Sequence, residues 1–185
     1  MTVVRRRFNV YEFEQMGRAG ILTEDDRVEL IEGEIVEMTP IGLRHAGCVN
    51  RLVALLAPVV TSRALLHVRN PIRIGEQSEP QPDLALLRPR QDYYAAGHPG
   101  PEDILLVIEV AETWTAYDRE VKISLYGRSG IREAWLVDLD AGQVEVFRQP
   151  GPEGYAERQI LRAQDTVSPL ALPDVSLRVG EILGS

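Results

Sequence analysis

The stretch ILLVIEVAETWTAYDREVKISLYGRSGIREAWLVD (residues 104–138) decides the fold class of this chain. It begins with an apolar run in which only Glu109 is polar, and such a run is typical of a strand buried on both faces. A helical pattern covers about 116–129 and is stopped by Gly130, and a short apolar strand follows at 134–137. Strand, helix and strand in this order predict a right-handed βαβ unit within a mixed α/β fold.

Length and composition indicate an ordinary globular domain that spans residues 1–185. The chain is 44% hydrophobic and 26% charged, and its length suffices for one substantial core but is short for two. No run reaches the roughly 20 apolar residues that cross a bilayer. The acidic residues that follow Arg5-Arg6-Arg7 are unlike a signal peptide. We therefore expect a cytoplasmic protein with no membrane partner.

Charge and cysteine content exclude several function classes. The formal charge is −8 and the pI is near 5.0, which opposes binding of nucleic acid through a broad basic face. Binding at a small, metal-neutralised site remains compatible with that charge. Cys48 is the only cysteine, so the chain has no internal disulfide and no site of several thiolate ligands. The sequence also has no P-loop, no G-x-G-x-x-G and no G-x-S-x-G motif.

The remaining elements follow from apolar periodicity and from chain-breaking residues. Alternating apolar residues on both sides of Gly33 predict a β-hairpin. Apolar spacings of three and four predict a helix that Pro58 should end or kink. Segment 88–103 is polar and turn-rich, so we expect a long surface loop. In chain order, the expected elements are a helix at 10–19, hairpin strands at 27–32 and 34–38, a helix at 45–57, strands at 65–74, 83–87 and 104–110, a helix at 116–129, a strand at 134–137 and a second hairpin at 143–148 and 155–161.

Two acidic residues fall at the ends of neighbouring predicted strands. Asp83 starts one strand, and Glu109 lies near the end of the next. The loop between the strands has little helical pattern, which permits an antiparallel pairing. In that pairing the start of one strand lies beside the end of the other. The sequence therefore predicts that both carboxylates share one end of the sheet.

The predicted helix adds an amine to this end of the sheet. Asp118, Lys122 and Tyr126 are spaced by four and form one stripe beside the apolar stripe. The βαβ geometry places the first turn of the helix near Glu109, and the lysine stem is long enough to reach the sheet end. Alternatively, Asp118 and Lys122 form only an i,i+4 surface pair, worth about 0.3 kcal/mol. The spacing by itself leaves both interpretations open.

Two acids and one amine at a poorly solvated rim favour a divalent cation. Unpaired carboxylates at short range raise each other's pKa, and a cation removes that penalty. Hard oxygen ligands in an incomplete protein shell suit Mg²⁺, with Mn²⁺ as a substitute, and leave bound waters for a substrate to displace. Such a metal acts as a Lewis acid and lowers the pKa of a bound water. Acids at strand ends are also common without any metal.

An ordered series of residues resembles a known family. The series is Glu29-Leu30-Ile31-Glu32-Gly33-Glu34-Ile35-Val36, His45, Pro82-Asp83, Glu109-Val110, Tyr117-Asp118-Arg119 with Lys122, Tyr126, and Ala134-Trp135-Leu136-Val137-Asp138. It resembles the Uma-type restriction endonuclease family, a branch of the PD-(D/E)xK nuclease superfamily, over about residues 8–183. The resemblance implies a restriction-endonuclease-like core, in which helices flank a central mixed sheet, with an additional hairpin at each end of the chain.

The resemblance also implies a reaction and residue roles. The expected activity is Mg²⁺-dependent endonuclease cleavage of DNA phosphodiester bonds. Asp83, Glu109 and the Val110 carbonyl match the metal ligands, and Lys122 matches the catalytic lysine. Relatives in the superfamily often dimerise to cut two strands, so a homodimer is expected by analogy.

Two departures from the family pattern leave an alternative open. The superfamily lysine usually lies two residues after the second acid, where this chain has Ala111, and Lys122 matches the displaced lysine that this branch carries on the following helix. Relatives often have Leu-Ser-Pro-Ser after the Glu-Val pair, whereas this chain has Ala111-Glu112-Thr113-Trp114. This change adds an acid and a bulky ring beside the proposed site. The alternative is a catalytically inactive nuclease fold retained as a DNA- or protein-binding module.

Four further polar residues are candidates for supporting roles: Glu32, His45, Asp118 and Tyr126. Glu29 and Glu32 lie on opposite faces of the hairpin strand, so one of them approaches the metal and the other is solvated. His45 begins a helix, where it contacts a phosphate or a metal-bound water, or is held by local hydrogen bonds. Tyr126 either donates a hydrogen bond near Lys122 or is a half-buried packing residue.

Overall fold

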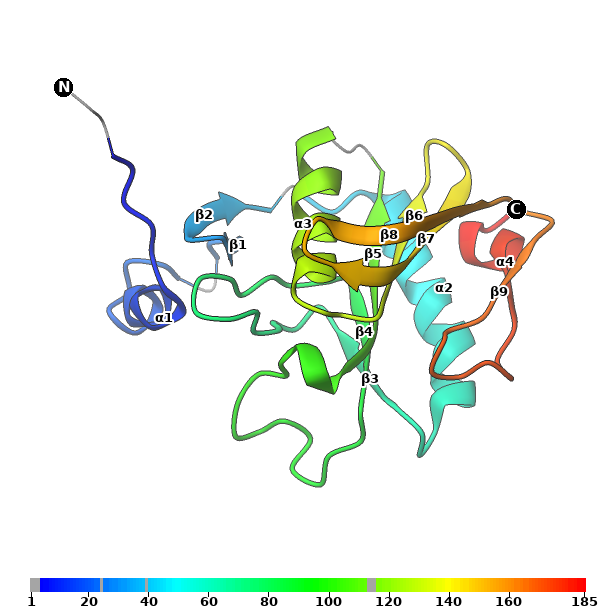
Figure 1. Ribbon diagram of the computed structural model, residues 1–185, viewed down its shortest axis with the longest axis horizontal. Helices are drawn as coiled ribbons and strands as arrows, with labels where there is room; N and C mark the ends of the chain where they lie inside the picture. Colours follow the sequence, from blue (N-terminus) through cyan, green and yellow to red (C-terminus); the bar gives the residue numbers. More distant parts are fainter. Residues whose placement is uncertain (1–3, 24, 39, 113–115) are drawn as a thin grey trace.

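A six-stranded sheet forms the centre of the computed structural model, which describes residues 4–23, 25–38, 40–112 and 116–185, apart from the side chains of 116–119. The strand order is β3-β4-β5-β6-β7-β8 (Figure 1). These strands are β3 (Leu65–Val68), β4 (Leu84–Leu87), β5 (Ile104–Ala111), β6 (Glu133–Asp138), β7 (Gln143–Gly151) and β8 (Gly154–Leu161). Two small separate sheets pair β1 (Val28–Ile31) with β2 (Glu34–Glu37) and β9 (Thr166–Val167) with β10 (Leu177–Arg178).

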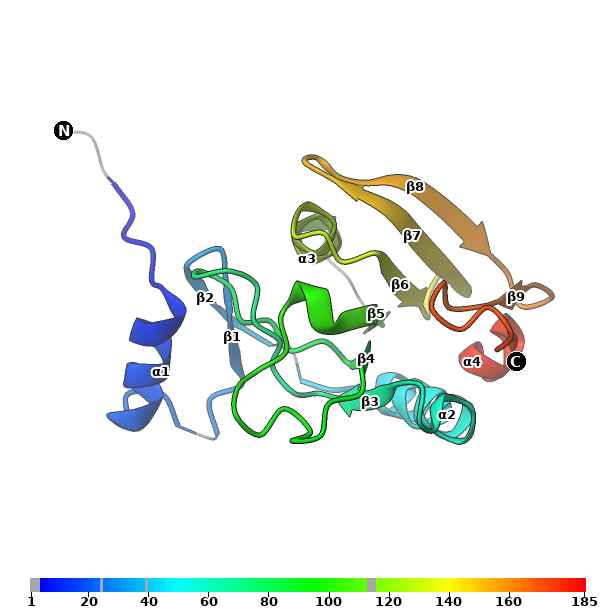
Figure 2. The ribbon, with the colours of Figure 1, turned by 60° about the horizontal axis from the view of Figure 1, so that its bottom comes forward.

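Four α-helices accompany the sheets. They are α1 (Val10–Arg18), α2 (Leu43–Val60), α3 (Ala116–Arg128) and α4 (Val179–Leu183), and a short 3₁₀ turn, Pro101–Asp103, ends the loop before β5. The sheet lies between α3 on one face and the pair α2 and α4 on the other (Figure 2). A central mixed sheet with flanking helices is the predicted fold class, which is therefore confirmed.

The sheet register brings the predicted strand ends together. β4 and β5 run antiparallel, and Leu84 at the start of β4 lies opposite Ile108 near the end of β5. β5 and β6 run parallel, and α3 forms the crossover between them. Both the antiparallel pairing and the βαβ unit agree with the predictions. Asp83 and Glu109 consequently lie at the same end of the sheet.

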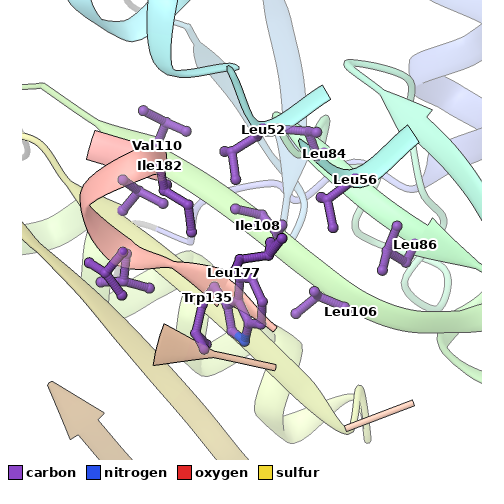
Figure 3. Close-up of a cluster of buried hydrophobic side chains, with 14 of the residues drawn as sticks. Leu52, Leu56, Leu84, Leu86, Leu106, Ile108, Val110, Trp135, Leu177 and Ile182 are labelled. Carbon is purple, nitrogen blue, oxygen red and sulfur yellow. The ribbon is translucent and has the colours of Figure 1, made fainter. Parts of the chain in front are cut away.

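Period-two alternation divides the buried residues of β5 between two cores. Leu106, Ile108 and Val110 pack with α2 and α4, and Trp135 of β6 joins them at the centre of this core (Figure 3). Residues between them, such as Val107, point to the opposite face, where α3 packs. Glu109 falls between Ile108 and Val110, so its side chain belongs to the face that α3 covers. The alternation therefore directs this carboxylate toward the helix that carries Lys122.

Several predicted boundaries are wrong, and two of them have a clear physical reason. Pro58 does not end α2, which continues to Val60; a proline removes one helical hydrogen bond, while burial of Val60 keeps the last turn packed on the core. The strand expected at 65–74 ends at Val68, because Arg69 has a φ of 50° and turns the chain. In both cases a tertiary or backbone constraint overrides the local pattern.

Helix α2 is long and apolar enough to cross a membrane by length and composition alone. In the structure it is a core helix, because Cys48, Val49, Leu52, Leu56 and Val60 are buried against the sheet and α4. The expectation that Cys48 is a small buried hydrophobe agrees with this placement.

Helix α3 approaches the β7–β8 hairpin at Gly127. A Cβ at this position would lie 2.6 Å from the backbone carbon of Gly154 and 2.8 Å from the nitrogen of Tyr155. We expect Gly127→Ala to lower the free energy of unfolding by about 1–3 kcal/mol through overpacking, as measured by urea denaturation. Gly17→Ala in α1 is the control, because no atom lies within 4 Å of the added Cβ. That variant should be unchanged or stabilised by up to about 1 kcal/mol, and an equal loss in both variants would contradict the packing argument.

Candidate active site

A cavity of about 170 Å³ opens at the end of the sheet where Asp83 and Glu109 meet. Its walls are formed by the β1–β2 hairpin and the segments on either side of it, the first turn of α2, the segment between β3 and β4, the end of β5, and α3. The lining residues are Arg27, Glu29, Val36, Glu37, Met38, Ile41, His45, Arg69, Gln81, Asp83, Glu109, Val110 and Lys122. The predicted site residues Asp83, Glu109, Val110, Lys122 and His45 are thus brought to one place.

Asp83 immediately precedes β4, and its carboxylate is held on one oxygen. Oδ2 accepts a hydrogen bond from the backbone N–H of Val110 at 2.9 Å and lies 3.0 Å from Nε2 of His45. The hydrogen bond from Val110 holds the Asp83 carboxylate near the end of β5, beside Glu109. Since this bond needs the β4–β5 register, the folded sheet fixes where Asp83 points.

Glu109 is 4% exposed and is contacted by two donors from α3. Its Oε1 accepts a hydrogen bond from the Tyr126 hydroxyl at 2.6 Å and lies 3.0 Å from Nζ of Lys122. Burial raises the pKa of Glu109 to about 7, and the positive charge of Lys122 offsets this only in part. Tyr126 is fully buried, so the structure shows the hydrogen-bonding arrangement rather than a half-buried packing residue.

Lys122 lies between two carboxylates. Its Nζ is 3.0 Å from Glu109 and 3.2 Å from Oε2 of Glu29, and the side chain is 13% exposed. The two carboxylates raise the pKa of Lys122 far above its usual value despite the burial. The two carboxylates therefore favour the ammonium form of Lys122. The composition also distinguishes Lys122. It is the only lysine in the sequence, and every other residue with a permanently charged basic side chain is an arginine.

The structure decides between Glu29 and Glu32. Glu29 lies on β1, is buried, and accepts a hydrogen bond from the Gln81 backbone at 3.0 Å in addition to its contact with Lys122. Glu32 lies in the hairpin turn with a φ of 48° and pairs with Arg128 at 2.6 Å, outside the cavity. Glu29, and not the predicted Glu32, therefore lines the cavity. The turn geometry, which the pattern of alternation does not give, decides which of the two acids faces inward.

One residue that the sequence did not suggest also reaches the cavity. Arg69 was not a candidate, yet it lines the cavity, and its Nη2 lies 3.2 Å from Nδ1 of His45. Nothing in the sequence distinguishes it, because arginines are numerous. Asp118 is part of α3, but its side chain lies outside the described part of the chain, as does Trp114. Glu112, from the altered stretch, turns toward Arg44, with 3.9 Å between the charged atoms.

The donor set has the chemistry of a hard-cation site. Within the described residues, Asp83, Glu29 and Glu109 each use one carboxylate oxygen for the hydrogen bonds above, and no hydrogen bond is formed by the other. Two carboxylates with completing waters satisfy Mg²⁺. No group of three His, Cys, Asp or Glu side chains in the described ranges is already arranged around one point. The acids therefore have the oxygen atoms that a divalent cation binds. In this structure the ammonium group of Lys122 supplies the positive charge between Glu29 and Glu109.

Comparison with known proteins assigns the family. The chain matches the family model Uma2, described as "Putative restriction endonuclease", over residues 10–180. The chain belongs to this family. A search of curated proteins found no match.

A solved structure shares the fold of this Uma2-family chain. It is described as "a putative nuclease" from Anabaena variabilis; the two sequences are 18% identical, the similarity covers 96% of this chain and 98% of the other, and the TM-score is 0.76. At this identity the likeness establishes the fold. It confirms the nuclease-type architecture that the sequence resemblance predicted.

Ala111, the second residue after Glu109, occupies the position at which the superfamily pattern predicts a lysine. Ala111 is buried at 3% exposure and packs under α3. The amine comes instead from Lys122, one helix later in the chain, and reaches Glu109 from above the sheet. The same pair of charges is therefore assembled by a tertiary contact rather than along one strand.

Proposed function

We propose that this protein is a metal-dependent nuclease that hydrolyses phosphodiester bonds of DNA. The observation that carries the proposal is the convergence of Asp83, Glu109, Glu29 and Lys122 on one cavity at the end of β5. Two carboxylates and an ammonium at this place are the groups that metal-assisted phosphoryl transfer requires. The nuclease family and fold support this assignment.

Each residue has a distinct proposed role. Asp83 and Glu109, with the Val110 carbonyl, would hold Mg²⁺ or Mn²⁺, which supplies Lewis-acid activation of a water when bound. Lys122 would donate hydrogen bonds to the attacking water and to a phosphate oxygen, because an ammonium stabilises the negative charge that develops in the transition state. Tyr126 holds the Glu109 carboxylate in place through the 2.6 Å hydrogen bond. Cleavage by in-line attack would leave a 5′-phosphate.

Metal binding is the first test of this proposal. Calorimetric titration of Mn²⁺ into the purified protein should show binding that Asp83→Asn and Glu109→Gln both abolish. Asp140→Asn, which changes an exposed acid paired with Arg44 outside the lining of the cavity, is the matched control and should bind as wild type does. A repeat with non-cleavable DNA tests whether a substrate phosphate is needed to complete the metal shell.

Cleavage is the second test. With Mn²⁺ or Mg²⁺ and single- or double-stranded DNA, wild type should release 5′-phosphate ends, whereas Asp83→Ala should lose activity while retaining its circular dichroism spectrum. Full activity of Asp83→Ala would contradict its role as a metal ligand.

The inactive binding module is the second candidate function. It is favoured by the ion pairs that already satisfy the acids and by the net charge of −8. DNA or protein binding without cleavage of any substrate would support it over the nuclease.

The single domain, the homodimer and the cytoplasmic location remain predictions from the sequence. Light scattering of the purified protein tests the homodimer.

A further inference from the structure

Arg69 adopts an unusual backbone conformation between β3 and β4. Its φ is 50°, a left-handed value that is uncommon for a residue with a long side chain and costs free energy of conformation. The Arg69 N–H donates to the backbone carbonyl of Asp83 at 3.1 Å. The strained residue is thus fastened directly to the first acid of the cavity.

The side chain of Arg69 is placed to donate a hydrogen bond to one ring nitrogen of His45. Nη2 of Arg69 lies 3.2 Å from Nδ1 of His45. A guanidinium has only donors, so Nδ1 must be the acceptor. In a neutral imidazole the proton then resides on Nε2, which lies 3.0 Å from Oδ2 of Asp83. The hydrogen bonds therefore run in one direction, from Arg69 to His45 to Asp83.

We propose that Arg69 is a positioning residue that selects the Nε2–H tautomer of His45 and thereby orients the Asp83 carboxylate. With His45 and the Val110 N–H both donating to Oδ2, the carboxylate cannot rotate without losing two hydrogen bonds. Oδ1 is left without one: Nε of Arg69 lies 3.7 Å away, which is too long, and this buried Nε has no hydrogen-bond partner among the described residues. Partners that orient a ligand in this way are a general feature of metal sites.

A spectroscopic experiment tests the tautomer without any metal or substrate. The chain has three histidines, so ¹⁵N-histidine labelling gives a spectrum in which His67→Gln and His98→Gln assign the other two. At pH 8, wild-type His45 should show a protonated Nε2 and an unprotonated, hydrogen-bonded Nδ1. Arg69→Met should shift the Nδ1 resonance toward that of a free acceptor, and Arg69→Lys should restore part of the shift. A protonated Nδ1 in wild type, or an Nδ1 signal unchanged in Arg69→Met, would overturn the proposal.

A matched variant separates the positioning effect from loss of charge. Arg27 lines the same cavity and forms no hydrogen bond or ion pair with His45 among the described residues. Arg27→Met therefore removes a charge and leaves the hydrogen-bonded series intact. We expect Arg69→Met to bind Mn²⁺ about tenfold or more weakly than Arg27→Met. In a His45→Ala background, Arg69→Met should have a smaller further effect, because only the 3.7 Å ion pair between Arg69 and Asp83 is then left to lose. Equal affinities of the two arginine variants, or fully additive effects of Arg69→Met and His45→Ala, would overturn it.

The predicted effect of Arg69 on metal binding rests on the proposed function, whereas the predicted tautomer of His45 does not. If wild type binds Mn²⁺ but cleaves no DNA, the nuclease proposal fails, while the tautomer and affinity results still decide the role of Arg69. If wild type binds no Mn²⁺, the ¹⁵N spectra alone decide it.

Discussion

Lys122→Met is expected to lower the free energy of unfolding by about 3–5 kcal/mol, because removing one member of a buried ion pair leaves uncompensated charge in the interior. Here two carboxylates, Glu29 and Glu109, lose the same ammonium. Methionine keeps the length and most of the apolar volume of the lysine stem, so the loss reports charge rather than packing. Urea denaturation of wild type and variant in metal-free buffer at pH 8, above the pKa of about 7 that Glu109 has beside Lys122, measures it.

Added Mn²⁺ should return part of that stability, since a ligand that binds only the folded state stabilises it by mass action. The gain should be larger in Lys122→Met than in wild type, because the metal no longer competes with the ammonium. Nuclease activity should stay absent even with metal bound. Arg128→Met is the control on the same helix: Arg128 is 37% exposed and pairs with Glu32 at the surface, and such pairs contribute about 0–1 kcal/mol. Comparable losses for the two variants would refute a buried, charge-compensating Lys122.

The second large effect concerns pH. Burial raises the pKa of Glu109 from its ordinary 4.5 to about 7 in the folded protein, so the folded state binds this proton more tightly than the unfolded state does. The stabilising effect of the proton is fully present below pH 4.5 and is lost as pH rises from 4.5 to about 7. Above pH 7 no further loss occurs. A shift of this size corresponds to about 3 kcal/mol.

Glu109→Gln removes this titration. In metal-free buffer, the stability of wild type relative to Glu109→Gln should therefore fall by about 2–3 kcal/mol between pH 5 and pH 8. Denaturation at several pH values measures the difference. Glu153→Gln, which removes a carboxylate exposed in the β7–β8 turn, is the charge-matched control. If the difference in free energy of unfolding between wild type and Glu109→Gln does not change with pH, the pKa of Glu109 is not raised. The contacts of Glu109 with Lys122 and Tyr126 would then outweigh the effect of burial on this pKa.

The sequence predicted the elements that depend on short-range patterns. The apolar run around Glu109 and the helical spacing after it gave the βαβ unit, and an antiparallel pairing placed Asp83 at the same end of the sheet. The position of Lys122 near that end followed from helix geometry. These predictions succeeded because strand alternation and helix periodicity are local, and because the crossover has a single preferred hand.

Other parts of the site depend on contacts between distant segments. Glu29, on a separate two-stranded sheet, reaches Lys122 because backbone contacts hold its strand against the segment before β4, among them the Leu30–Glu79 bridge. Arg69 reaches His45 because of a left-handed backbone that its residue type disfavours. The extension of α2 past Pro58 likewise depended on burial of Val60. None of these is visible in a local pattern.

By itself, the sequence determined which residues lie at the ends of the core strands and on which face of each strand they point, because a period of two or 3.6 residues fixes direction along an element. Only the tertiary structure decided which charges meet. The acids, Lys122, His45 and Arg69 come from five separate segments, and their ion pairs form because the cavity is poorly solvated and each charge needs a partner. That requirement acts across the whole fold, so it is satisfied only when the segments have packed.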